Sequence, residues 1–300
     1  MRAQLSHDPY TQACRYIDLV VPLGTLYMHS NVDVDHINGV RGVEGVLKAL
    51  DDQRDTLTAQ VVAFPQSGLL CKPGTVQLMD DALRLGAQVV GGLDPTAFDG
   101  DGRASIRAVF DLAQKHQKPI DFHLHEAGDL GLTDAEYIAE ATEAYGMAGQ
   151  VTLSHAFCLS EPESPRLAAP IERLARLGIH VVTAPTSSGA PKAAPLLNAG
   201  INLCGGHDNM RDLWNPLGTG AMLERVRYIA MHNSFRRERD FRTALGMCTA
   251  NGARLMGLKD YGLSPGCPAD MVLVMADNIS HAAAVLPQGR IVLRQGRVVR

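Results

Sequence analysis

Seven short apolar segments, separated by stretches of helical periodicity, limit the folds open to this chain more than any other feature. They lie at residues 24–28, 60–64, 88–93, 120–124, 150–154, 180–183 and 201–204. Strands that alternate with helices at intervals of roughly 20–35 residues predict βα units and a parallel sheet. Because the segments are apolar throughout, they indicate a sheet buried on both faces.

The number of strands is one short of a (β/α)8 TIM-type barrel, the closed form of such an α/β sheet. Closure removes the unpaired edges that seven strands would leave bare. Three explanations stay open: one strand is hidden in the sequence, the sheet is open, or the chain lacks its first unit. With 300 residues and 46% hydrophobic content, the chain can bury one large core, or a core and a small satellite domain.

The character of the sequence changes after Gly266. Residues 269–274 and 289–299 are typical of short antiparallel strands, and Gln295 and Gly296 form a turn signal. A fragment of this size is too small for a stable sheet of its own. We therefore expect a barrel at residues 1–265 and, packed on it, a small β-sandwich remnant at residues 266–300.

Charge, cysteines and apolar runs exclude several classes of protein. A formal net charge of −4 predicts no basic surface for nucleic acid or an anionic membrane. No apolar run is long enough for a membrane-spanning helix, and the first residues lack the apolar segment of a secretory signal. The six cysteines are scattered and never form CxxC, which favours reduced thiols in a cytoplasm.

Polar side chains follow several of the predicted strands, where a barrel carries its catalytic residues. They include Gln66, His123, Glu126, His155 and Asp208. Imidazole nitrogens are good ligands for zinc or iron(II), and a nearby carboxylate moves protons for a water molecule at such a metal.

Each of these residues also has an ordinary structural explanation. A histidine at a strand end is often a hydrogen-bonding partner, Glu126 alone would be a loop carboxylate or a helix cap, and Asp208 would cap a helix that begins near Asp212. The joint pattern is harder to explain in this way, because three successive strands are expected to end in His/Glu, His and His-Asp. Separate structural roles would not place these residues in one layer.

Four segments make the prediction more specific. They are VVAFPQSG (61–68), IDFHLHEAG (120–128), VTLSHAFC (151–158) and INLCGGHDNMRDLWNPLGTG (201–220). They resemble the amidohydrolase superfamily, on the branch of cytosine deaminase and N-isopropylammelide isopropylaminohydrolase. The segment NGARLMGLKDYGLSPGCPADMVLV (251–274) resembles the end of that superfamily's barrel, which passes into a small β-sandwich. The resemblance covers essentially the whole chain in order.

The resemblance implies a metal site and two catalytic residues. One divalent metal ion, zinc or iron, would be held by His123 and Asp208. Glu126 would carry a proton from the attacking water to the substrate ring and its leaving amine. His155 would orient that water or stabilise charge on the substrate.

The resemblance also implies substrate contacts. Gln66 would hydrogen-bond the amide edge of a heterocycle, and Trp214 would line the pocket, unless it is an ordinary core or lid aromatic. Asn209 stands where cytosine deaminases usually carry a second acidic residue, so cytosine is only one candidate among aminated pyrimidines, triazines and similar cyclic amidines. The implied enzyme is a homo-oligomer that removes an amino or alkylamino group from such a small molecule.

The chain departs from this pattern at its start. The family's first strand supplies two metal ligands as HxH, and no such motif precedes Met28. The simplest hypothesis is a chain that lacks its first unit, in which His123 and Asp208 hold a metal weakly, with His125 as a further candidate ligand. The alternative is a metal-free inactive relative with a binding or structural role. A hydantoin- or dihydropyrimidine-opening hydrolase is less favoured, because residues 88–94 contain no lysine for carboxylation.

Overall fold

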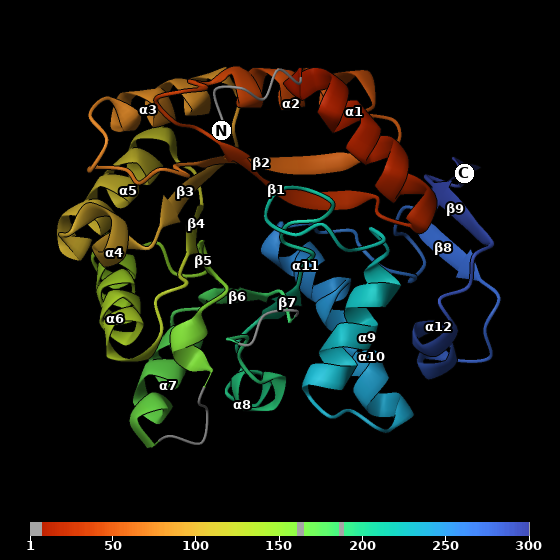
Figure 1. Ribbon diagram of the computed structural model, residues 1–300. Helices are drawn as coiled ribbons and strands as arrows, with labels where there is room; N and C mark the ends of the chain where they lie inside the picture. Colours follow the sequence, from red (N-terminus) through yellow and green to blue (C-terminus); the bar gives the residue numbers. More distant parts are fainter. Residues whose placement is uncertain (1–7, 161–164, 186–188, 300) are drawn as a thin grey trace.

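A parallel sheet of seven strands, bent into an open arc, forms the centre of the molecule (Figure 1). The computed structural model describes residues 8–160, 165–185 and 189–299. The sheet has the order β1-β2-β3-β4-β5-β6-β7, so neighbours in sequence are neighbours in space. Its strands are β1 (Tyr27–Asp33), β2 (Thr58–Phe64), β3 (Val89–Leu93), β4 (Ile120–His123), β5 (Val151–Ser154), β6 (His180–Thr183) and β7 (Leu203–Gly205).

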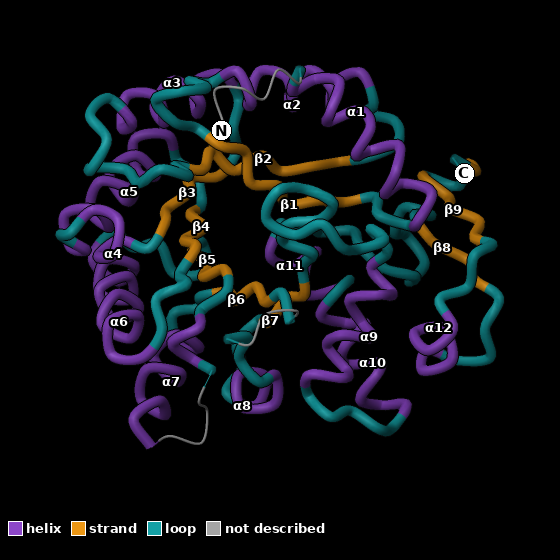
Figure 2. The backbone as a smooth tube through the Cα atoms, viewed as in Figure 1, coloured by secondary structure: helices purple, strands orange, loops and turns teal. Residues whose placement is uncertain are grey.

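Most of the helices cover the outer side of the arc, whereas those that follow β7 lie at its open side (Figure 2). These helices are α1 (Pro9–Val20), α2 (Arg41–Asp52), α3 (Thr75–Leu85), α4 (Pro95–Asp99), α5 (Gly102–His116), α6 (Gly128–Ala144), α7 (Ala168–Arg176), α8 (Ala193–Asn198), α9 (Met222–His232), α10 (Glu238–Met247) and α11 (Ala250–Leu255). In the described residues, no helix is long and apolar enough to cross a membrane. Each of the six cysteines is free, as expected.

Helix α5 shows how local sequence sets these elements. The carboxylate of Asp101 accepts a hydrogen bond from the backbone N–H of Ala104 and caps the first turn. Ile106, Phe110 and Ala113 follow at the spacing of one helical face, and all three are buried against the sheet. The alternation of amphipathic helices and apolar strands was predicted from the sequence, and the parallel α/β sheet is confirmed.

The first strand begins later than the sequence suggested. Residues 24–28 were predicted as a strand, whereas β1 spans Tyr27–Asp33. The chain is still leaving α1 at this point, through a 3-10 turn at Val21–Leu23 that ends at Gly24 with φ 98°. An apolar run alone does not reveal such a helix ending, so the prediction was wrong by several residues.

The sheet stays open between β1 and β7. Among the described residues, neither strand pairs with anything on its outer edge. A cavity of about 1980 Å³ lies along the inner face of the arc and reaches both strands. This space exceeds the roughly 300–1000 Å³ of an ordinary ligand pocket.

The C-terminal segment forms a small antiparallel sheet, β10-β9-β8. Its elements are β8 (Met271–Val274), α12 (Ile279–Val285), β9 (Arg290–Arg294) and β10 (Arg297–Val298). The predicted turn is confirmed, since Gln295 and Gly296 both have positive φ angles, but helix α12 was missed. Val292 of β9 packs with residues of α1 in a second apolar cluster, which attaches this sheet to the larger one.

Candidate metal centre

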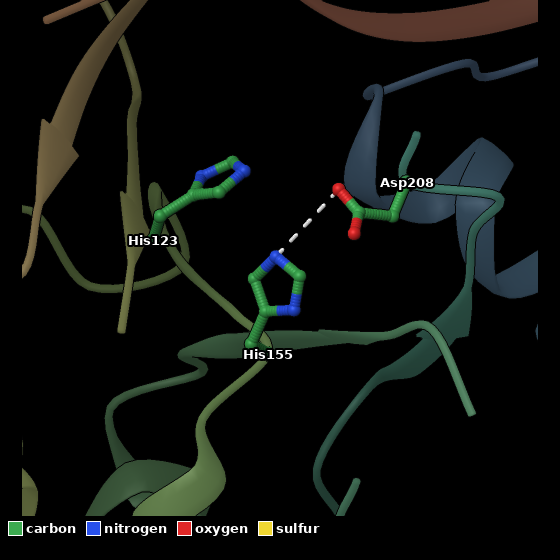
Figure 3. A group of neighbouring side chains, drawn as sticks. All are labelled: His123, His155 and Asp208. Atoms are coloured by element: carbon green, nitrogen blue, oxygen red, sulfur yellow. Dashed lines mark ion pairs between the residues drawn. The ribbon is translucent and has the colours of Figure 1, made fainter. Parts of the chain in front are cut away.

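Two histidines and an aspartate meet at the carboxyl ends of three strands. His123 ends β4, His155 follows β5, and Asp208 follows β7. One ligand atom of each lies within 4.8 Å of the others. Figure 3 shows the three side chains around a common space, with 3.9 Å between His155 Nε2 and Asp208 Oδ1. The sequence had indicated three successive strands, and here it was wrong, because β6 lies between β5 and β7.

Strand register explains why the two histidines are close. His123 lies opposite Ser154 in the parallel ladder, so His155 stands one residue beyond it. His155 has φ 69°, and its backbone N–H donates to the carbonyl of Val182 on β6. Asp208 likewise has φ 59°. Such left-handed backbone is uncommon outside glycine and is frequent at functional sites.

Burial keeps both imidazoles neutral. It lowers the pKa of His123 to about 4, and burial together with the neighbouring His125 lowers the pKa of His155 to about 4. His123 Nδ1 is buried without a hydrogen-bond partner. Burial raises the pKa of Asp208, while His123 opposes this shift. Two neutral imidazoles beside a carboxylate are a donor set that fits a zinc or iron(II) ion.

The structure brings Glu126 near the cluster but not into it. Its Oε1 accepts a 2.6 Å hydrogen bond from the backbone N–H of Ala97, at the first turn of α4. Burial, followed by the neighbouring Asp134, raises the pKa of Glu126 to about 8. The raised pKa favours the protonated form of the Glu126 carboxyl group near neutral pH, and the residue is not part of the cavity wall.

Gln66, Asn209 and Trp214 all lie along the large cavity. Gln66 is half-buried beyond β2. Trp214 is 69% exposed, so it stands on the cavity rim and is not a core residue. The side-chain amide of Asn209 donates to Asp212 Oδ2 at 2.7 Å.

Asp212 organises the loop that carries Asn209 and Trp214. Its Oδ1 accepts backbone hydrogen bonds from Trp214 and Asn215. The helix expected near Asp212 is absent from this described segment, and α9 begins only at Met222. The idea that Asp208 caps such a helix is therefore wrong.

A buried carboxylate that contacts a histidine near the cluster was not predicted from the sequence. Asp121 is completely buried on β4, two residues before His123 and therefore on the same side of the strand. Its carboxylate accepts from Ser154 Oγ at 2.7 Å and lies 3.0 Å from His29 Nε2 on β1. Although burial would raise the pKa of Asp121, these partners lower it. A carboxylate in an otherwise apolar strand was the signal available in the sequence.

Comparison with known proteins identifies the family to which this chain belongs. The model of the amidohydrolase family matches residues 36–300. The chain belongs to the amidohydrolase family. It is 34% identical over 282 residues to an N-isopropylammelide isopropyl amidohydrolase of Pseudomonas sp. strain ADP, across 92% of this chain and 69% of that protein.

Two solved structures are similar over nearly the whole chain. The N-isopropylammelide isopropylaminohydrolase of Burkholderia multivorans superposes with a TM-score of 0.96 at 39% identity, across 99% of this chain and 77% of that one. A 5-methylcytosine deaminase of Klebsiella pneumoniae, liganded with 5-fluorocytosine, gives a TM-score of 0.89 at 28% identity, across 98% and 76%. The expected branch and the expected class of enzyme, a hydrolase of carbon–nitrogen bonds, are confirmed.

Proposed function

We propose that this chain carries the active site of a metal-dependent hydrolase that removes an amino or alkylamino group from a nitrogen heterocycle. The observation that carries the proposal is the cluster of His123, His155 and Asp208, which opens into a large cavity at the strand ends. The relatives support the substrate class, because their names specify isopropylammelide and 5-methylcytosine. Cyclic amidines with an exocyclic nitrogen are therefore the candidate substrates.

One divalent ion, zinc or iron, would bind at His123 and Asp208. When bound, such an ion supplies Lewis-acid activation of the attacking water. His123 suits this role because its ring is neutral and its Nδ1 has no competing partner. Asp208 supplies the negative charge opposite the imidazoles.

The surrounding side chains would orient water and move protons. His155, neutral and facing Asp208, would hold the attacking water through its ring nitrogen. Glu126, whose pKa is raised to about 8, would take a proton from the attacking water and deliver it to the leaving amine. To do so, its side chain must turn from Ala97 toward the cavity. Gln66 would bond the amide edge of the ring, and Asn209 and Trp214 would form the wall and rim.

We further propose that the sheet belongs to an eight-stranded barrel. The unpaired edges of β1 and β7 and the oversized cavity between them leave room for one strand supplied from outside residues 1–300. We retain a boundary near residue 265, with residues 266–300 as part of a β-sandwich. A homo-oligomeric, cytoplasmic enzyme remains the expected setting.

The alternative is a metal-free relative with a binding or structural role. The relatives disfavour it, because they are named as amidohydrolases and deaminases. The cluster also disfavours it, because a buried imidazole nitrogen without a partner is costly unless something binds there.

Metal content and amine release test the proposal together. We expect about one zinc or iron per chain by elemental analysis, and release of ammonia or alkylamine from one of a panel of aminated pyrimidines and triazines. His123→Ala and Asp208→Asn should lose both, whereas His281→Ala, at a partly exposed histidine on α12, should lose neither. A protein that binds no metal and releases no amine contradicts the proposal. Metal without amine release contradicts the substrate class alone.

A further inference from the structure

Asp94 holds the segment that follows β4 from the end of the neighbouring strand β3. Its Oδ1 accepts backbone hydrogen bonds from His125 at 2.6 Å and from Glu126 at 3.2 Å. Its own backbone N–H donates to the carbonyl of His123. Asp94 has φ 31°, a left-handed conformation that is strained for a residue with a side chain. The fold therefore maintains this residue at an energetic cost.

The second carboxylate oxygen of Asp94 binds a side chain. Asp94 Oδ2 lies 2.8 Å from Nδ1 of the His125 ring. The ring centroid of His125 is 4.2 Å from that of His155 and 5.7 Å from that of Phe157. Three neighbours thus fix the His125 ring, which lines the large cavity with 40% of its side chain exposed. In the described part of the chain, no hydrogen-bond partner is recorded for its Nε2.

When the His125 ring is neutral, the Asp94 contact decides which nitrogen carries the proton. A carboxylate only accepts hydrogen bonds, so Nδ1 must be the protonated nitrogen. Nε2 then keeps its lone pair and is an acceptor. The His125 ring lies beside His155 and lines the cavity in which a bound heterocycle would lie. An acceptor in this place selects ligands that present an N–H group.

We propose that His125 determines substrate specificity by accepting a hydrogen bond from an N–H of the heterocycle, and that Asp94 is the positioning residue that keeps its Nε2 an acceptor. This inference rests on the proposed function and deepens it. It selects heterocycles with a free ring N–H or a primary or secondary amino group. It disfavours fully N-alkylated rings.

The substitution Asp94→Asn reverses the polarity of the contact without emptying the site. The remaining carbonyl oxygen can still accept the two backbone hydrogen bonds, whereas the new NH₂ group faces His125 Nδ1 and donates to it. The His125 ring must then carry its proton on Nε2. His125 Nε2 then changes from a hydrogen-bond acceptor to a hydrogen-bond donor.

Two further variants control for loss of packing. His125→Phe keeps an aromatic ring against His155 and Phe157 but removes the acceptor. Asp99→Asn alters a matched carboxylate that caps another loop, where Asp99 Oδ1 accepts from the backbone N–H groups of Leu69, Leu70 and Cys71. Asp99→Asn should leave His125 unchanged.

Nuclear magnetic resonance of the full chain, labelled with ¹⁵N-histidine, measures the tautomer directly. We expect His125 to be protonated on Nδ1, and Asp94→Asn to move the proton to Nε2. Uracil serves as the probe because it has ring N–H groups and no amine to lose. It should shift the His125 Nε2 resonance, and its affinity should fall about 10-fold in Asp94→Asn and His125→Phe. Binding of 1,3-dimethyluracil, which has no N–H, should not fall in these variants.

Three results would overturn the inference: a proton on Nε2 of the unmodified protein, a tautomer that Asp94→Asn leaves unchanged, or an Nε2 resonance that millimolar uracil does not move. Amine release is measured separately. Release with the opposite tautomer refutes this inference alone. The expected tautomer and uracil shift without any amine release refute the proposed function alone.

Discussion

The two sides of the candidate metal centre are built differently. On one side, His123 and His155 stand at the ends of β4 and β5, each 7% exposed and held by the strand ladder. On the other side, Asp208 lies on the loop after β7, with 40% of its side chain exposed. Within that loop, Asp212 accepts hydrogen bonds from two backbone N–H groups, and Met210 packs in the second apolar cluster.

The strand side carries the histidines proposed for metal binding and catalysis, whereas the loop side carries residues proposed to contact the substrate. On the strand side, the strand ladder positions the two imidazoles. Burial lowers the pKa of His123 and of His155, which favours the neutral form of both rings. The loop side carries Asn209 and Trp214, and the Trp214 side chain is 69% exposed. Substitutions on the strand side should therefore affect folding and chemistry together, whereas those on the loop side should affect only binding or chemistry.

The largest effects test this contrast at the centre itself. His123→Ala and Asp208→Asn should each weaken metal binding by roughly 100-fold or more and abolish amine release. In metal-free protein, His123→Ala should lower the free energy of unfolding by about 2 kcal/mol, because it empties a buried site. Asp208→Asn should change it by less than about 0.5 kcal/mol, since asparagine tolerates the left-handed backbone. Equal losses of stability in urea unfolding would remove the distinction between the two sides.

Glu126→Gln should give the next largest effect. If Glu126 protonates the leaving amine, kcat should fall by roughly 10²–10⁴-fold while metal content stays unchanged. An unchanged kcat would exclude this role and leave Glu126 as a cap of α4.

The same variant should change how the free energy of unfolding depends on pH. The pKa of Glu126 rises from 4.5 to about 8 on folding, so its contribution is fully present below pH 4.5 and is lost as pH rises through about 8. Glutamine does not titrate. Relative to the unmodified protein, Glu126→Gln should therefore gain stability as the pH rises from 5 to 9. Parallel pH profiles of unfolding would contradict the raised pKa.

The smallest effect is expected at the rim. Trp214→Ala should raise KM several-fold and change the free energy of unfolding by less than about 0.5 kcal/mol, because the side chain is 69% exposed. Kinetic titration and urea unfolding measure the two quantities. A loss of stability above about 1 kcal/mol would show that the loop side is as firmly packed as the strand side.

Sequence patterns were enough to predict the βα repeat, the small C-terminal sheet with its turn at Gln295 and Gly296, and the polar residues at strand ends. These features depend on local periodicity and turn chemistry, which a single sequence contains. It did not reveal the start of β1, because a helix ending at Gly24 looks like an apolar strand. It also missed α12, whose seven residues are too few for a clear period.

Which polar side chains meet depends on how the strands pack in the folded protein. Strand register placed His155 beside His123, and the bend of the sheet brought Asp208 across from β7. The same packing turned Glu126 toward α4 and paired Asp121 with His29, two arrangements with no local signal. Contacts between strands far apart in sequence depend on register and curvature. The burial that sets the pKa of each group is likewise a property of the assembled fold.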